Sequence, residues 1–222
     1  MYEPSERVPM IISGPGIAAG RNVYNLTSLL DVYPTLVAMA NQPTRNSNGE
    51  NKSVAPLASL DSSLDGYSLF PLMQSAGSGY TSAYPRDRAV VSQYHSNMGN
   101  TGSFMLRQGP WKYIAFGHGL PEIFNATSYS PQLFNVDEDP QELHDKSKLL
   151  PDVVSELDRL LQMVVDYQSV DREAKANDQA LYRSYFSEKF GEGELRQRFE
   201  QVYQGFDDAD FEKVKRWAKM TP

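Results

Sequence analysis

Residues 103–116 read SFMLRQGPWKYIAF, two apolar and aromatic runs separated by Gly109 and Pro110. Runs of this composition favour β-strands, and a Gly-Pro pair between them is typical of a tight turn, so the stretch predicts a β-hairpin. Two similar runs flank it along the chain, RAVVSQY at 88–94 and QLFNV at 132–136. Together the four runs predict a small antiparallel sheet.

An amphipathic helix is expected after the sheet. Between Pro151 and Gln168 the apolar residues recur at three- and four-residue intervals, namely at Val153, Val154, Leu157, Leu160, Leu161, Val164 and Val165. This spacing is typical of one buried helix face, which would pack most simply across the sheet. Just before it, residues 139–142 read DPQE, a capping-box variant that predicts a turn of helix.

Charge and turn residues are distributed unevenly along the chain. Residues 1–136 hold 8 acidic and 8 basic side chains with 12 of the 15 glycines, whereas residues 137–222 hold 20 acids and 13 bases. Strands and turns are therefore expected first and charged helices afterwards. Breaks near Gly191 and Gly205 predict two or three helices in 171–222, the last capped by Asp207 or Asp208.

Three features are expected in the N-terminal third. The run VPMIIS at 8–13 predicts a short strand buried on both faces. A helix is expected over about 32–40, with Asp31 at its N-cap and Pro34 in its first turn. The Asn- and Ser-rich residues 42–63 predict a polar surface insertion.

Composition excludes several classes of function. The chain has 222 residues, a formal net charge of −7 and no cysteine. The negative charge argues against a nucleic-acid partner, and the missing thiols exclude disulfides, thiolate zinc sites and a cysteine nucleophile. No stretch is apolar and long enough to predict a membrane span, and the first residues lack the pattern of a signal peptide.

Six motifs in a fixed order connect the chain to a known family. They read MYEPSERVPMIISGPGIAAG, SLLDVYPTLVAMA, DGYSLFPLM, VVSQYHSN, FMLRQGPWKYIAF and PQLFNVDEDPQEL. In this order they resemble the C-terminal part of a type I sulfatase, continuously from Met1 to about Gln168 and more weakly over the tail.

The resemblance implies a fold of α/β plus α+β class. Residues 1–85 would be the end of an alkaline-phosphatase-like α/β domain, with 42–63 as its insertion. Residues 86–170 would form an α+β subdomain, a four-stranded antiparallel sheet with a packed helix. Residues 171–222 would be a helical tail.

The family's chemistry requires parts that the resemblance places outside this chain. Its nucleophile is a formylglycine made from Cys or Ser in the pattern C/S-x-P-x-R, and a calcium ion neutralises the sulfate oxygens. The nearest match, residues 41–45 (NQPTR), begins with an asparagine that cannot become the aldehyde. We therefore expect a sulfuric ester hydrolase whose catalytic and calcium-binding residues belong to the N-terminal half, and we expect this chain alone to be inactive.

The resemblance also implies a sulfated saccharide as substrate, with the sulfate on a uronic acid of a glycosaminoglycan. His95 falls in a run similar to the family's SEFHG, near the active-site mouth, where it would hydrogen-bond a sugar. Gln93 stands where the family has glutamate. Arg107 and Lys112 offer positive charge to an acidic sugar. The alternatives are structural: a strand-end histidine that caps a loop, and solvated cations on a sheet face.

The remaining polar clusters favour structural roles. Glu3 and Arg7 suggest an ion pair or strand-entry hydrogen bonds. The acidic stretch 137–142 lacks the central glycine of a calcium-binding EF-hand loop, and helix capping explains two of its acids. His118 and His144 are expected at the surface. No metal site is predicted within the chain.

Three N-glycosylation sequons begin at Asn25, Asn51 and Asn125. They are compatible with the lysosomal or secreted location that the resemblance implies. Two other functions remain open: a non-catalytic binding module or pseudo-enzyme, and a phosphatase or phosphodiesterase of the same superfamily.

Overall fold

The structure is a computed structural model of the chain. It describes residues 1–14, 16–41, 44–45, 51–52, 66–74, 87–95, 101–118 and 129–220, of which 44–45, 51–52 and 187–188 are described by their backbone alone. The chain divides into two compact units. We call Met1–Arg7 together with Val91–Pro222 the sheet unit, and Val8–Val90 the N-terminal unit. Each is described by itself.

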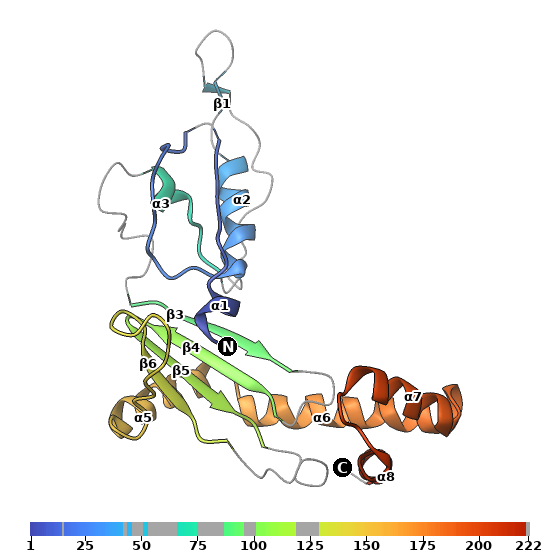
Figure 1. The fold of residues 1–222 in the computed structure, drawn as a ribbon. Coiled ribbons are helices and arrows are strands. Elements are labelled where there is room, and N and C mark those ends of the chain that lie inside the picture. The colour runs from blue at the N-terminus through green and yellow to red at the C-terminus, as the bar shows by residue number, and fades with distance from the viewer. Residues whose placement is uncertain are drawn as a thin grey trace. The chain divides into compact units, whose positions relative to one another are not determined.

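The sheet unit is built on a four-stranded antiparallel sheet (Figure 1). Its strands are β3 (Ala89–Tyr94), β4 (Ser103–Gln108), β5 (Trp111–Phe116) and β6 (Gln132–Asn135), hydrogen-bonded in that order. In the central hairpin Arg107 lies opposite Lys112. Gly109, with φ of 53°, supplies the left-handed turn conformation that the hairpin requires. The predicted hairpin and sheet are confirmed.

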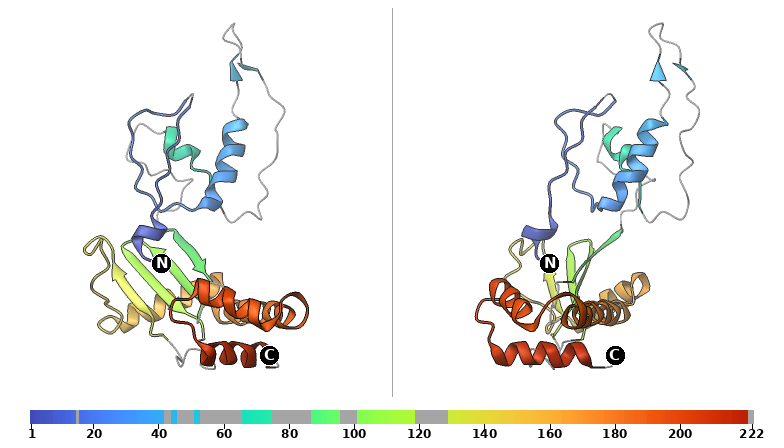
Figure 2. Two further views of the ribbon diagram at one scale, coloured as in Figure 1. Left: turned by 45° about the vertical axis from the view of Figure 1, so that its right-hand side comes forward. Right: turned by 90° about the vertical axis from the view of Figure 1, so that its right-hand side faces the viewer.

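One face of the sheet carries an apolar core beneath helix α5 (Pro151–Val164). Phe104 and Leu106 alternate with Met105 along β4, so they share this face. The helix contributes Leu157 and Leu161, which are buried. The right-hand view of Figure 2 shows α5 and α6 on one side of the strands. The expected packing of a helix on the sheet is confirmed.

The opposite face of the sheet is covered by the first residues of the chain, which include the short helix α1 (Glu3–Glu6). Met1 packs against a cluster formed by Met105, Ile114 and Phe134, and the ring of Tyr2 meets that of Phe134 edge-on at 5.9 Å. The central strands are consequently buried on both faces. The sequence pattern did not predict this second cover.

Two local predictions near the sheet are wrong. The helix expected over 151–168 ends at Val164, and Asp166 caps a new helix, α6 (Tyr167–Ser184), by accepting a hydrogen bond from the Ser169 N–H. Residues 139–142 form a turn without helix, because Glu142 takes a left-handed backbone conformation with φ of 55°. Its side chain then points to the sheet face, where it meets Lys112.

The tail is a helical cluster with an aromatic core of its own. Helix α6 continues into a π-helical turn (Tyr185–Lys189), followed by α7 (Glu192–Val202) and α8 (Asp208–Lys219). Its buried residues include Tyr182, Phe199 and Trp217, with the Tyr182 and Phe199 rings stacked at 5.6 Å. Asp207 caps α8, as predicted.

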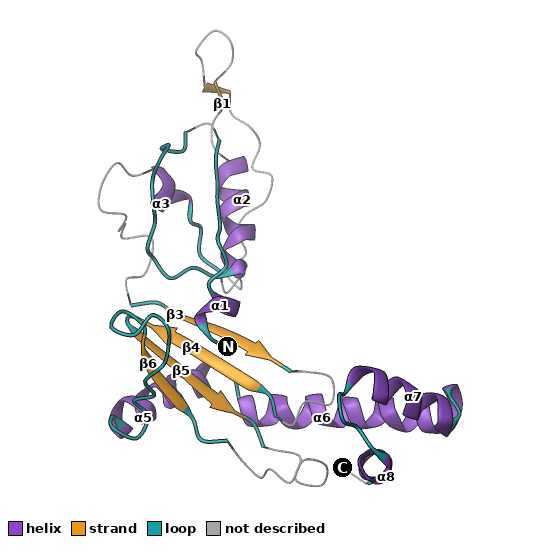
Figure 3. Ribbon diagram, in the orientation of Figure 1, coloured by secondary structure: helices purple, strands orange, loops and turns teal. Residues whose placement is uncertain are grey.

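The N-terminal unit is dominated by loops among its described residues (Figure 3). It contains a 3-10 turn (Leu29–Asp31), α2 (Val32–Ala40), α3 (Phe70–Gln74) and the short paired strands β1 (Thr44–Arg45) and β2 (Asn51–Lys52). The predicted bounds of α2 are confirmed. A small core gathers Leu69, Phe70, Leu72 and Met73.

Asp31 has a different role from the N-cap predicted for it. Its side chain makes no capping bond to α2. The buried carboxylate instead pairs with Arg88 at 2.5 Å and accepts hydrogen bonds from the backbone N–H groups of Ser28 and Tyr67. A full negative charge attracts a guanidinium more strongly than it attracts one helix terminus, and the pair joins distant segments of the unit.

The strand predicted at residues 8–13 is not formed. The segment has no regular secondary structure, and Ile11 is 92% exposed. A buried strand needs neighbouring strands for its backbone groups and apolar layers on both faces, and no described strand pairs with this segment. Within the described residues, no helix is both long and apolar enough to cross a membrane.

Candidate functional site

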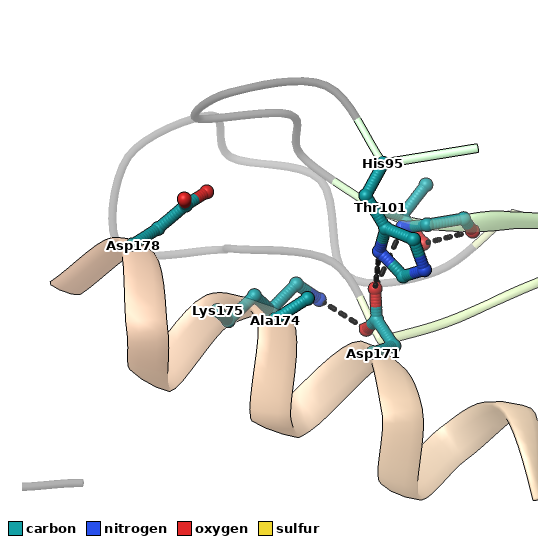
Figure 4. A pocket seen from close by; sticks show the side chains of 7 residues that line it. His95, Thr101, Asp171, Ala174, Lys175 and Asp178 are labelled. Atoms are coloured by element: carbon teal, nitrogen blue, oxygen red, sulfur yellow. Dashed lines mark hydrogen bonds and ion pairs between the residues drawn. The ribbon is translucent and has the colours of Figure 1, made fainter.

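His95 follows the last residue of β3 and lines a small pocket at the end of the sheet (Figure 4). Thr101 and Gly102 line it from the approach to β4, and α6 contributes Asp171, Ala174, Lys175 and Asp178. The His95 side chain is 22% exposed, and its ring meets the Phe104 ring edge-on at 5.1 Å. A strand end and a tail helix therefore form this pocket together.

Asp171 is the charged centre of the pocket and is fully buried. Its Oδ1 accepts a hydrogen bond of 2.6 Å from the Gly102 N–H and lies 4.0 Å from Nδ1 of His95. Its Oδ2 accepts a hydrogen bond of 2.5 Å from Nζ of Lys175. A buried carboxylate is stable only with such partners, so Asp171 fastens α6 to the sheet through the Gly102 N–H.

Two glycines leave the space that this carboxylate occupies. A Cβ atom added at Gly117 would lie 2.1 Å from Cγ of Asp171, and one added at Gly102 would lie 2.4 Å from Cε1 of His95. The backbones of the two glycines are themselves joined by a hydrogen bond from Gly117 N–H to Gly102 O of 3.0 Å. Any larger residue at either position would displace Asp171 or His95.

The other two predicted substrate residues lie in an ion-pair network on the opposite sheet face. Nζ of Lys112 is 2.7 Å from Oε1 of Glu3 and 2.9 Å from Oε1 of Glu142, and its side chain is 1% exposed. Arg107 pairs with the same Glu3 oxygen at 3.2 Å and lies 3.8 Å from Oδ1 of Asp137. Both cations therefore hold the N-terminal segment on the sheet, a geometry that favours a structural role.

Sequence reasoning assigned no role in this network to Glu142. Its Oε2 accepts a hydrogen bond of 2.5 Å from the Glu3 N–H, so one carboxylate binds both Lys112 and the N-terminal segment. The expected partner of Glu3 was Arg7, but Glu3 pairs with Arg107 and Lys112 instead. Residues that are more than a hundred positions apart cannot be recognised as partners from a local sequence pattern.

Asp158 of α5 forms a second polar centre that the sequence pattern did not indicate. It accepts hydrogen bonds from the hydroxyls of Tyr113 at 2.8 Å and Tyr167 at 2.9 Å, so it joins β5, α5 and α6. Burial and the adjacent Asp158 carboxylate raise the pKa of Tyr113 well above its ordinary value. The same two causes raise the pKa of Tyr167. Both hydroxyls consequently stay protonated as donors.

The described residues do not fit the cofactors that the resemblance implies. Within the ranges that the structure describes, no group of three or more His, Cys, Asp or Glu side chains is arranged to hold a metal ion. The carboxylate of Asp139 accepts a hydrogen bond of 2.8 Å from the His144 N–H. We therefore assign no calcium ligand among the residues that the structure describes.

The remaining predicted positions are at the surface or outside the described residues. His118 and His144 are exposed, as expected. Asn25 is partly exposed, in a segment without helix or strand. Asn125 lies outside the described residues, and Asn51 is described only by its backbone in β2. Glycosylation of the three sequons stays a prediction.

Comparison with known proteins gives a consistent result in sequence and in structure. No family model matches the chain. Arylsulfatase K of Danio rerio is 37% identical over 172 residues, which are 78% of this chain and 28% of that protein. Arylsulfatase K of Homo sapiens is 33% identical over 171 residues, 77% of this chain and 28% of that protein.

The fold agrees with these relatives. A Bacteroides thetaiotaomicron protein assigned to the sulfatases matches 73% of this chain and 30% of its own, with a TM-score of 0.51 and 21% identity. The sequence similarity supports the predicted resemblance to the C-terminal part of a sulfatase, and the solved structure agrees with it in fold. Within that family it is similar to arylsulfatase K.

The chain spans a little over a quarter of the length of the curated relatives that it matches. The predicted family and the fold class are confirmed.

Proposed function

We propose that this chain is the C-terminal part of an enzyme that hydrolyses sulfate esters on a uronic acid of a glycosaminoglycan. The observation that carries the proposal is the 37% identity to an arylsulfatase K over 172 residues. In this proposal the formylglycine nucleophile and the calcium ligands belong to the polypeptide outside this chain. This chain would supply one wall of the substrate site.

The requirement for the N-terminal half is supported by the surface of the N-terminal unit. Large apolar side chains are exposed along its first thirty residues: Val8, Met10, Ile11, Val23, Tyr24, Leu29, Leu30, Val32, Tyr33 and Leu36. Exposed large apolar side chains in this number favour an interaction site. In the proposal, the N-terminal half of the sulfatase domain packs against it.

Among the predicted substrate residues, His95 has the best position for contact with a saccharide. It is partly exposed and lines a pocket with Thr101 and Lys175. Arg107 and Lys112 would act indirectly, because their charges are already paired with carboxylates of this chain. The roles of all three residues stay predictions until a variant is assayed.

The location proposed for the intact protein is the lysosome or the cell exterior. The support is the family membership together with three sequons, of which Asn25 is partly exposed. Mass spectrometry of the protein secreted from a eukaryotic host would show hexose-containing mass additions at these asparagines. An unmodified chain would contradict the proposed glycosylation.

Sulfate release from a 2-O-sulfated uronate disaccharide tests the function. We expect the full-length protein to release sulfate with calcium present and to lose the activity after chelation, whereas the 222-residue chain releases none. Saccharide binding without turnover by the full-length protein would favour a non-catalytic module. Hydrolysis of a phosphate ester with bound zinc would favour the phosphatase alternative.

A further inference from the structure

The two edges of the four-stranded sheet differ in how they are covered. At β6 the following loop satisfies the outward backbone groups of Leu133: its N–H donates to Oδ1 of Asp145 at 3.1 Å, and its carbonyl oxygen accepts from the Lys146 N–H at 2.8 Å. The other edge is β3, which is the last strand in the hydrogen-bonded order and has β4 as its neighbour (Figure 1). Among the described residues, no backbone hydrogen bond joins another segment to the outer side of β3.

The sequence of β3 lacks the features that usually prevent pairing at a sheet edge. Ala89–Tyr94 reads AVVSQY and contains no proline and no charged residue. Natural edge strands are commonly protected by lysine, proline, a bulge or a covering segment, as β6 is by its loop. β3 is also the most exposed strand of the sheet: Gln93 and Tyr94 are exposed and its other residues are half-buried, whereas the middle residues of β4 and β5 are buried.

Both ends of β3 are held in place, so the strand needs little ordering before it pairs. Just before it, the buried Arg88 forms its ion pair with Asp31. Just after it, the His95 ring packs edge-on against Phe104 at 5.1 Å. In an antiparallel ladder every second residue directs its N–H and carbonyl groups away from the neighbouring strand. β3 therefore presents a regular row of outward donors and acceptors, to which an extended segment can add as a strand with little cost in conformational entropy.

We propose that an extended segment of the sulfatase polypeptide outside this chain pairs with the outer edge of β3, as a fifth strand of the sheet. The inference rests on the proposed function in one respect, since that proposal joins this chain to an N-terminal half. The chain spans a little over a quarter of the length of its curated relatives, so most of such a protein lies outside it. Moreover, Ala89 and Val90 belong to the N-terminal unit, whose exposed apolar side chains favour an interaction site.

The composition of β3 also indicates the kind of segment that fits it. Side chains on neighbouring strands form cross-strand pairs, and β-branched residues pair well with one another. Because β3 contributes two valines and no charged side chain, the partner strand should be uncharged and rich in β-branched residues.

Residue-resolved hydrogen exchange, measured by mass spectrometry with electron-transfer fragmentation, tests the proposal in the 222-residue chain and in the full-length protein. In the chain we expect an alternating pattern over Ala89–Tyr94, in which every second amide is protected by β4 and the others exchange rapidly. In the full-length protein we expect the rapid amides to slow by at least about 100-fold. Equally rapid exchange of those amides in both proteins would overturn the proposal.

Two other results would also overturn it, because each identifies a different occupant of the edge. Protection of all the amides of β3 in the dilute, monomeric chain would mean that residues of this chain already cover the strand. Protection that grows with the concentration of the chain, together with dimers in analytical ultracentrifugation, would assign the edge to a second copy.

Val91→Pro and Ser92→Pro form a matched pair of variants, because neighbouring residues direct their N–H groups to opposite sides of the strand. The exchange pattern identifies which of the two N–H groups points outward. Proline at that position should leave the unfolding midpoint of the chain nearly unchanged and lower that of the full-length protein, since only the fifth strand loses a hydrogen bond. Proline at the other position should lower both midpoints. An outward proline with the same effect on both proteins would contradict the added strand.

Failure of the proposed function is distinguishable from failure of the added strand. If the full-length protein releases no sulfate but the outer amides of β3 are slowed, the proposed function fails and the added strand stands. If it releases sulfate while those amides exchange equally fast in both proteins, the added strand fails and the proposed function stands.

Discussion

The two units of the chain differ in how far their apolar side chains are buried. In the sheet unit Phe104, Leu106 and Leu161 are fully buried, and both faces of the central strands are covered. In the N-terminal unit Ile11 and Tyr24 are almost fully exposed, although Ile11 belongs to the apolar run at residues 8–13. Within this chain, therefore, the central strands of the sheet unit have packing partners on both faces, whereas these apolar side chains of the N-terminal unit stay exposed.

Polar groups strengthen the contrast. The sheet unit joins its distant segments through two buried centres, at Lys112 and Asp171, and through the half-buried Asp158. The N-terminal unit has one such centre, the Asp31–Arg88 pair, within its described residues. Four variants, ordered from the largest expected effect to the smallest, test this contrast: three in the sheet unit and one in the N-terminal unit.

Lys112→Met should destabilise the sheet unit most. It leaves the buried Glu142 without its cation, while Glu3 keeps Arg107, and an uncompensated buried charge costs about 3–5 kcal/mol. Denaturant unfolding followed by tryptophan fluorescence, from Trp111 in the sheet and Trp217 in the tail, would measure the loss. The control is Lys148→Met at an exposed lysine. Equal unfolding midpoints for the two variants would show that the network contributes nothing.

Tyr113→Phe should lower the free energy of unfolding by about 1.5–3 kcal/mol at neutral pH, because a hydrogen bond to the charged Asp158 is lost. The folded-state pKa of Tyr113 is raised, so its contribution is complete below about pH 10 and is lost as the pH rises further. The difference between the two proteins should therefore shrink above pH 10. A difference that grows with pH would contradict this linkage.

Gly117→Ala should cost about 1–3 kcal/mol through overpacking, since the added Cβ would overlap Asp171. Gly191→Ala is the matched control, because a Cβ there meets no atom within 4 Å. Thermal unfolding monitored by circular dichroism would compare them. Equal decreases of the melting temperature in the two variants would contradict this, because they would show that the contact of Asp171 with residue 117 does not limit the size of that residue.

Ile11→Ser should have the smallest effect on the isolated chain, within about 0.5 kcal/mol, because the side chain is already exposed. In the full-length protein the same change should cost about 1.5–3 kcal/mol, the value of burying an isoleucine. Chemical denaturation of both proteins would give the two figures. An equally small loss in both would mean that no other part of the protein covers Ile11.

The sequence predicted those elements whose signals are local. Hairpin strands with a Gly-Pro turn, the amphipathic face of α5 and the Asp207 cap all depend on residues within a few positions of each other, and the structure confirms them. Residues 8–13 mark the limit of this reasoning. Their composition favours a buried strand, but a strand forms only where neighbours can pair with it.

The polar centres could not be predicted because their partners are distant in the chain. Glu142 was assigned to a helix cap on local pattern, yet it meets Lys112 and Glu3 through the tertiary fold. Asp171 falls in a stretch read only as a charged helix, and its burial depends on the space left by Gly102 and Gly117. His95 was predicted from its resemblance to the family motif, but nothing in the sequence indicated that Asp171 lies beside it.

Hydrogen exchange at residues 8–13 tests most directly whether the N-terminal unit is completed by a part of the protein outside this chain. The amides of this segment would be measured by mass spectrometry in the 222-residue chain and in the full-length protein. We predict rapid exchange in the chain and exchange slower by at least about 100-fold in the full-length protein, where the segment would pair within the sulfatase domain. Equally rapid exchange in both would contradict the account.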